Sequence, residues 1–102
     1  MNELIDKLEN EMGLPFYFLE RPEEQVNIIC YRYTKEFVIS DITKESSLYT
    51  FKFSLIVDKD INKNIEKLED ILFKYNFAEI KVYETLTSNN LFETIISGSK
   101  LI

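Results

Sequence analysis

Histidine and tryptophan are absent from this 102-residue chain, which contains one cysteine and two glycines. Without histidine, the chain lacks the most frequent general base and the commonest metal ligand of proteins. With glycine only at positions 13 and 98, it also lacks the glycine-rich loop that holds phosphates. We therefore expect no enzymatic activity, no metal and no cofactor, and a protein that acts through contact with other proteins.

The single cysteine cannot form an internal disulfide, which fits a reducing compartment. Cys30 lies inside an apolar run over residues 26–33, where we expect a buried, unreactive thiol. The longest apolar stretch, residues 14–19, is much shorter than the roughly 20 residues of a membrane-spanning helix. The acidic first residues do not resemble a secretion signal. The sequence predicts neither a disulfide nor membrane association.

Negative charge is concentrated at the N-terminal end. The chain has 18 acidic and 12 basic residues, a net charge of −6. Residues 1–24 hold seven of the acids and two of the bases, a net of −5, and the rest of the chain has a net of −1. Such an acidic quarter repels nucleic-acid phosphates and anionic lipid. It serves either to meet a basic partner surface or to keep the protein soluble.

Apolar residues at helical spacing predict two helices. The first covers residues 1–12, with Asn2 as its N-cap and Gly13 as its left-handed terminator. The second covers residues 61–75 and ends at Asn76.

Alternating or continuous apolar residues predict strands, and the clearest alternation covers residues 48–57. Between these elements we expect a connector over residues 14–24, a polar loop over 43–47 and a hairpin turn over 87–90. The predicted strands cover residues 26–33, 37–42, 48–57, 78–86 and 91–97. The order predicts a single α+β domain over residues 1–102, with a mostly antiparallel sheet and two helices packed on one face.

Residues 58–69 match the acidic positions of a calcium-binding loop, with Asp58, Asp60 and Glu69 at positions 1, 3 and 12. Lys63 stands where that loop needs glycine. A predicted strand precedes the segment, whereas a calcium-binding loop of this kind follows a helix. We therefore interpret Asp58 or Asp60 as the N-cap of the second helix, without a metal.

Adjacent carboxylates occur at residues 23–24 and 69–70. Neighbouring residues of a helix do not face each other, so Glu69 and Asp70 cannot form a paired-acid site alone. Asp70 and Lys74 are four residues apart with the acid first, which favours an ion pair on a solvated helix face.

The alternating aromatics Tyr49, Phe51 and Phe53 are superficially similar to the stacking strand of an RNA-recognition sheet. That strand carries glycines and a basic flank, whereas this chain is acidic and Lys52 stands alone. We interpret these aromatics as core residues.

Three consecutive aromatics, Phe16, Tyr17 and Phe18, open the connector over residues 14–24. Alternate residues of an extended segment face opposite ways, so at least one large ring should lie near the surface. Exposed aromatics favour contact with a partner. The predicted interface consists of these three rings and the nearby acids: Phe16, Tyr17, Phe18, Glu20, Glu23 and Glu24.

The amphipathic helix, the segment GLPFYFLERPEE and the apolar strand VNIICYRY together resemble small structural proteins of the tailed-phage neck. The family is that of tail-terminator or tail-completion proteins, including prophage copies. Its order also agrees with the later strand over residues 49–57, the helix over 61–75 and the terminal hairpin.

The resemblance implies a small α+β protein that forms a homo-oligomeric ring, commonly a hexamer, at the head-proximal end of the tail tube. Such a protein joins tail to head and has tail-tube and connector proteins as partners. It implies no sequence-specific nucleic-acid binding, assembly in the bacterial host cytoplasm, and a final place in the virion neck. The alternative is a small acidic inhibitor or immunity-type module that binds a basic partner.

Overall fold

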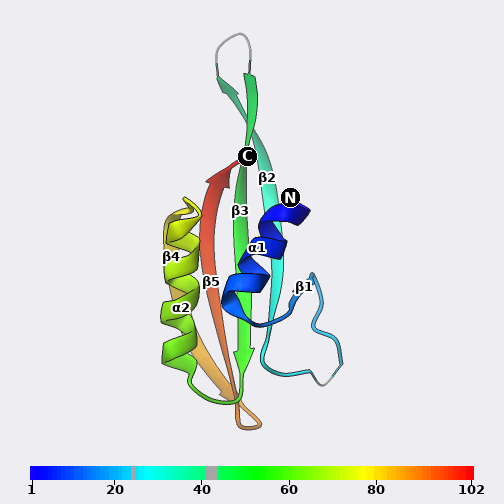
Figure 1. The fold of residues 1–102 in the computed structure, drawn as a ribbon, viewed down its shortest axis with the longest axis vertical. Coiled ribbons are helices and arrows are strands. Elements are labelled where there is room, and N and C mark those ends of the chain that lie inside the picture. The colour runs from blue at the N-terminus through cyan, green and yellow to red at the C-terminus, as the bar shows by residue number, and fades with distance from the viewer. Residues whose placement is uncertain (24, 41–43) are drawn as a thin grey trace.

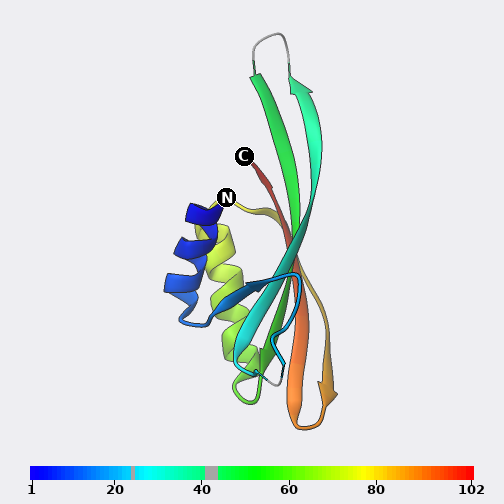
Figure 2. The same cartoon turned by 90° about the vertical axis from the view of Figure 1, so that its right-hand side faces the viewer.

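The computed structural model describes residues 1–23, 25–40 and 44–102. Its α+β fold consists of one five-stranded sheet in the order β1-β2-β3-β5-β4 and two helices. Figure 1 shows both helices in front of the sheet, and the quarter turn of Figure 2 shows them on the same side of it. The predicted class, a mostly antiparallel sheet with two helices on one face, is confirmed.

The centre of the sheet is β3 (Lys44–Val57), which pairs antiparallel with β2 (Ile28–Ser40) and with β5 (Leu91–Leu101). Its alternation acts as predicted, because Phe51, Phe53, Leu55 and Val57 are buried toward the helices. Burial of such large side chains supplies most of the driving force for folding. Strand β3 therefore contributes four large side chains to the main hydrophobic core.

The two helices close this core. Helix α1 (Asn2–Met12) begins after Met1, so Asn2 is its first residue and not its N-cap, and it ends at Gly13 with φ 76°. Helix α2 (Ile61–Lys74) begins after Asp60, whose side chain makes no capping hydrogen bond. Asn76, with φ 64°, follows α2 in the left-handed conformation that the sequence predicted.

Two corrections concern the N-terminal half of the sheet. The predicted connector contains a short strand, β1 (Phe16–Phe18), which pairs parallel with β2. The two strands predicted over residues 26–33 and 37–42 are one continuous strand, β2, as far as Ser40. Ladder hydrogen bonds to β3 along its whole length hold β2 extended through the polar residues between the two predicted segments.

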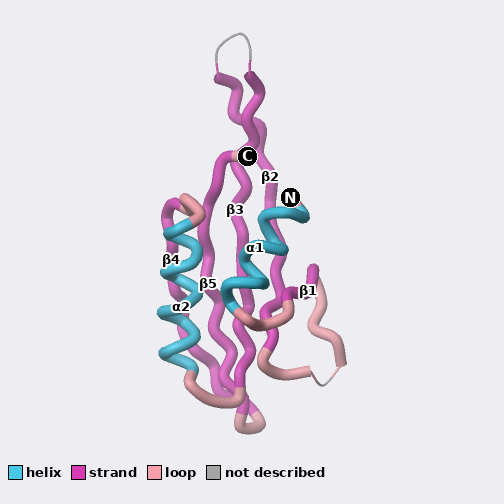
Figure 3. The backbone as a smooth tube through the Cα atoms, viewed as in Figure 1, coloured by secondary structure: helices cyan, strands magenta, loops and turns pink. Residues whose placement is uncertain are grey.

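The β2–β3 hairpin extends beyond the rest of the sheet (Figures 1 and 3). Residues 44–47 were predicted as part of a polar loop, but Lys44 pairs with Ser40 and already belongs to β3. Residues 41–43 lie outside the described residues. The projection gives the molecule principal extents of 52 × 24 × 23 Å. We call this projecting hairpin the arm; its described residues are 37–40 of β2 and 44–47 of β3, which lie beyond the last pair of β3 with β5.

The opposite edge of the sheet is formed by β4 (Ala78–Ser88), which pairs antiparallel with β5. Both strands are longer than predicted, and their connection is only Asn89 and Asn90, with φ 51° and 62°. Two successive positive φ values characterise the tight turn that fits the twist of a hairpin, and asparagine tolerates them.

Helix α2 connects β3 to β4 across β5. Among the described residues, neither helix has the length and apolarity needed to cross a membrane.

Candidate assembly surfaces

Phe16, the first of the predicted interface residues, is in the core. It is 8% exposed, and its ring centroid lies 6.3 Å from that of Tyr31 and 6.2 Å from that of Phe53. Its backbone N–H donates to Glu9 Oε2 at 2.8 Å, which connects β1 to α1. Phe16 therefore stabilises the fold and does not offer a surface to a partner.

Tyr17 points to the other side of the sheet, as alternation requires. Its hydroxyl donates to Gln25 Oε1 at 2.8 Å, and its half-buried ring packs against a small cluster of Ile28, Cys30 and Ile56. This cluster lies on the face that the helices leave uncovered. We call that side of the sheet the open face.

Burial raises the pKa of the Cys30 thiol, with a smaller opposing influence from Arg21. A raised thiol pKa means less thiolate at neutral pH, and thiolate is the reactive form. The structure thus agrees with the predicted buried, unreactive cysteine.

Phe18 is the exposed ring of the three, at 49%. It packs against Tyr31 and Tyr33 with centroid distances of 5.3 and 5.7 Å, and Tyr33 in turn lies 5.3 Å from Tyr49. Aromatic contacts at these distances are attractive beyond the area they bury. Phe18 therefore begins an aromatic row that runs from β1 toward the arm.

The row continues onto the arm through Lys35 and Phe37. Lys35 Nζ lies 5.2 Å from the ring centroid of Phe37 and 5.7 Å from that of Tyr49, and Phe37 is 71% exposed. Sequence reasoning missed this extension because it divided β2 into two strands. The sequence did contain a signal for one long strand, because every second residue on one face is large: Ile29, Tyr31, Tyr33, Lys35 and Phe37.

Glu20 and Glu23, the acidic candidates of the described chain, are both exposed in the segment that follows β1. Arg21, between them, donates its Nε–H to the backbone oxygen of Gln25 at 2.8 Å. Glu24 lies outside the described residues. The structure therefore brings Phe18 and the two carboxylates to the β1 edge, and separates them from buried Phe16.

The open face carries a row of positive charge that the sequence did not reveal. In the register of the sheet, Arg32 lies opposite Lys52, Lys52 opposite Ser97, and Ser97 opposite Lys81. All three cationic side chains are exposed. The interpretation that Lys52 stands alone is wrong, because pairing of distant strands places Arg32 directly opposite it and Lys81 two strands away, beyond Ser97.

The segment that matched a calcium loop does not form one. Asp58 precedes α2, whereas Asn62, Asn64 and Glu69 lie within the helix, so the twelve residues do not wrap around a common centre. Over the described ranges, the structure contains no group of three or more His, Cys, Asp or Glu residues arranged to hold a metal ion.

Comparison with known proteins gives a likeness of fold. No protein-family profile and no curated protein matches the sequence. A chain from the virion of a native gene transfer agent (GTA) particle superposes with a TM-score of 0.54 and 9% identity, over 96% of this chain and 87% of that one. A second solved structure, of a protein without a functional name, gives a TM-score of 0.57 and 11% identity over 96% and 86%. At such identities the likeness concerns the fold alone.

Proposed function

We propose that this chain is a structural assembly protein of a phage-like particle, and that it acts by contact and not by catalysis. The observation that carries the proposal is the likeness of fold to a chain of a gene transfer agent virion, which extends over 96% of this chain. The surfaces fit such a role, since exposed aromatic and charged residues lie at the β1 edge, on the arm and on the open face.

Within that class we propose the role of a tail terminator, a ring that stops growth of the tail tube and joins it to the head. The support is the resemblance of the segment GLPFYFLERPEE and its flanking elements to that family, together with a virion protein of the same fold. A ring needs a patch that meets a different patch on the neighbouring copy. The two edges of this sheet differ in that way, with Phe18 near one edge and the exposed β4 at the other.

The test combines solution mass with a tube-assembly assay. The purified chain is added to a self-assembling phage tail-tube protein, and tube lengths are measured by electron microscopy. We expect shorter tubes with a ring at one end, and a concentration-dependent rise in mass of the chain alone. An acidic protein of similar size is the control. Unaltered tubes together with a strict monomer would contradict the proposal.

A further inference from the structure

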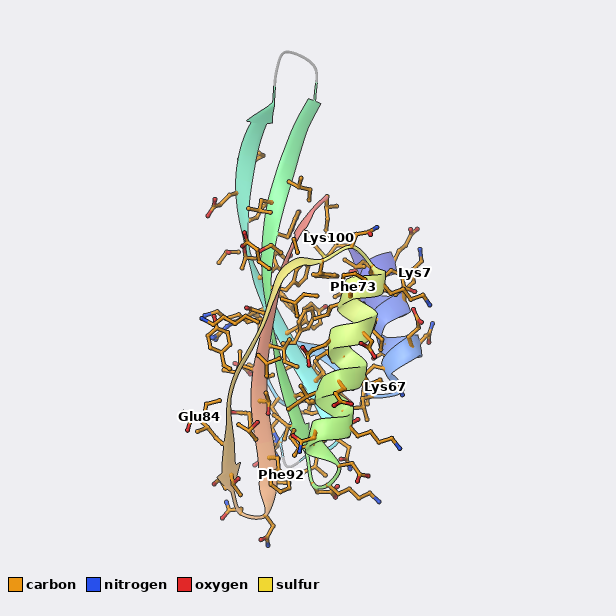
Figure 4. The ribbon with its side chains drawn as sticks, turned by 90° about the vertical axis from the view of Figure 1, so that its left-hand side faces the viewer. Lys7, Lys67, Phe73, Glu84, Phe92 and Lys100 are labelled. Atoms are coloured by element: carbon orange, nitrogen blue, oxygen red, sulfur yellow. The ribbon has the colours of Figure 1, made fainter. Side chains whose placement is uncertain are left out.

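The open face is divided into rows by the register of the strands, and one row is cationic. Arg32 on β2, Lys52 on β3 and Lys81 on β4 share a row with the neutral Ser97 of β5. Figure 4 shows the helix layer, with Lys67 and Phe73, on the other side of the sheet, so no helix covers this row. We call Arg32, Lys52 and Lys81 the basic row.

Within the described parts of the chain, no carboxylate forms a salt bridge with the basic row, and Lys81 Nζ lies 4.9 Å from the centroid of the Tyr83 ring. Among the described residues, the structure contains a salt bridge between Lys74 and Glu11, which lies in the helix layer and not on the open face. The neighbouring row on the arm side consists of the hydroxyl residues Thr34, Thr50 and Ser99. Like charges directly opposite each other, as Arg32 and Lys52 are, destabilise a sheet. Among the described residues, the fold thus holds Arg32 and Lys52 opposite each other without a salt bridge that would offset this repulsion.

Two acids of the open face, Glu36 and Glu93, are too distant to neutralise the row. Glu36 and Glu93 lie two rows away on either side, beside Leu48 and Ile56. Rows on one face are separated by two residues, so these distances are about 13 Å, beyond the Debye length of about 8 Å at physiological salt. Glu84 extends from β4 on the same side, three residues along the strand from Lys81 (Figure 4), so this acid lies nearer to Lys81 than to Arg32 and Lys52 on β2 and β3.

We propose that the basic row is the docking site for the acidic segment after β1, with Glu20 and Glu23, of a second copy of this chain. The charges are complementary, since these two carboxylates are exposed and also have no cation partner in the described structure. This inference rests on the proposed function, because it names the self-contact from which a ring is built.

Size favours a short acidic segment over nucleic acid as the occupant. Three cations spread over four strands span about 14 Å at the usual strand spacing, which suits a short loop. The acidic segment and the basic row are different surfaces, so the contact is heterologous and repeats from copy to copy.

The experiment reverses each side of the contact and then restores complementarity. Arg32→Glu with Lys52→Glu makes the row acidic, and Glu20→Lys with Glu23→Lys makes the segment basic. Self-association is measured by sedimentation velocity at low and high salt. We expect each double variant alone to raise the dissociation constant by about tenfold or more. An equimolar mixture of the two should recover wild-type association, because every contact is again complementary. High salt should weaken association of the wild type.

Lys63→Glu with Lys67→Glu on α2 is the matched control, because it changes net charge equally on the helix side. Circular dichroism reports whether each variant is folded. If the wild type assembles and reversal of the row has no effect beyond the control, the docking inference is overturned while self-assembly stands. If the wild type is a strict monomer, both the inference and the ring proposal fail. Duplex DNA binding that depends on the row, with unaltered self-association, would assign the row to nucleic acid and also overturn the inference.

Discussion

Lys74 Nζ, in the last turn of α2, lies 2.6 Å from Glu11 Oε1, in the last turn of α1. The sequence predicted that Lys74 would pair with Asp70 on its own helix. The structure instead uses Lys74 to join the two helices. The Lys74 ammonium, and next the Tyr75 side chain, hold the pKa of Glu11 below its usual value, and Glu11 raises the pKa of Lys74.

This ion pair predicts a pH-dependent contribution to stability. Because the pKa of Glu11 is lower in the folded than in the unfolded chain, its contribution is present at neutral pH and is lost as pH falls through the lowered pKa. The raised pKa of Lys74 means that its contribution is lost only at strongly alkaline pH. Glu11→Gln should therefore lower the melting temperature at neutral pH and have little effect in strong acid.

Thermal melts of both proteins across the acid range check this expectation. Glu66→Gln, which removes an exposed carboxylate that has no ion pair in the described structure, is the control. A difference between wild type and Glu11→Gln that stays constant with pH would show that the variant acts through packing and not through charge.

Gly98 leaves the space that Phe77 occupies. A Cβ at position 98 would lie 3.2 Å from Phe77 Cδ2, and the Phe77 ring packs edge-on against Phe51 and Phe53 at 5.5 and 6.1 Å. Gly98→Ala must displace a ring that is held on two sides, and overpacking of this kind costs about 1–3 kcal/mol. Urea denaturation should show this loss, and Ser97→Ala, on the opposite face, should not.

The sequence was most informative where local pattern and tertiary packing agree. Alternation over residues 49–57 predicted β3 and its buried face, because large apolar residues at every second position are typical of a strand with one face in the core. Gly13 and Asn76 marked the ends of both helices, since few residues adopt left-handed φ at low cost. Local chemistry was enough for these elements.

The missed features depend on pairing between distant strands. Nothing within residues 16–18 indicates that they form a parallel strand with β2, and a strand of three residues is too short for a periodic signal. The basic row arises because Lys52 lies 20 positions from Arg32 and 29 from Lys81 in the sequence but shares their row in the sheet. Register is a property of the folded sheet, so composition and spacing did not reveal this surface.

Leu19 adopts a backbone conformation that leucine disfavours. Its φ is 69°, in the left-handed region, and its side chain is 62% exposed. That conformation costs a residue with Cβ about 1–2 kcal/mol, which glycine avoids. Leu19→Gly should therefore stabilise the protein by up to about 1 kcal/mol, part of the gain being offset by greater freedom of the unfolded chain.

Chemical denaturation of Leu19→Gly and Leu86→Gly separates strain from the general effect of glycine. Leu86 has a similar exposure of 57% but lies within β4, where glycine weakens a strand. We expect opposite signs for the two variants. Destabilisation by both would mean that the Leu19 side chain contributes more than its backbone costs.

Phe16 and Phe18 are two residues apart on the same face of β1, yet the structure gives them different roles. Phe16→Ala removes a core ring and should destabilise the protein by about 3–5 kcal/mol. Phe18→Ala removes a ring that is 49% exposed and rests on Tyr31 and Tyr33, so its effect on stability should be near 1 kcal/mol.

If the β1 edge contacts a neighbouring copy, Phe18→Ala should weaken self-association while the fold persists, since aromatic residues are frequent hot spots whose truncation to alanine weakens binding. Melting curves and sedimentation of the two variants check both expectations, with exposed Phe73→Ala on α2 as the control. Equal association of Phe18→Ala, Phe73→Ala and wild type would exclude the β1 edge from the interface.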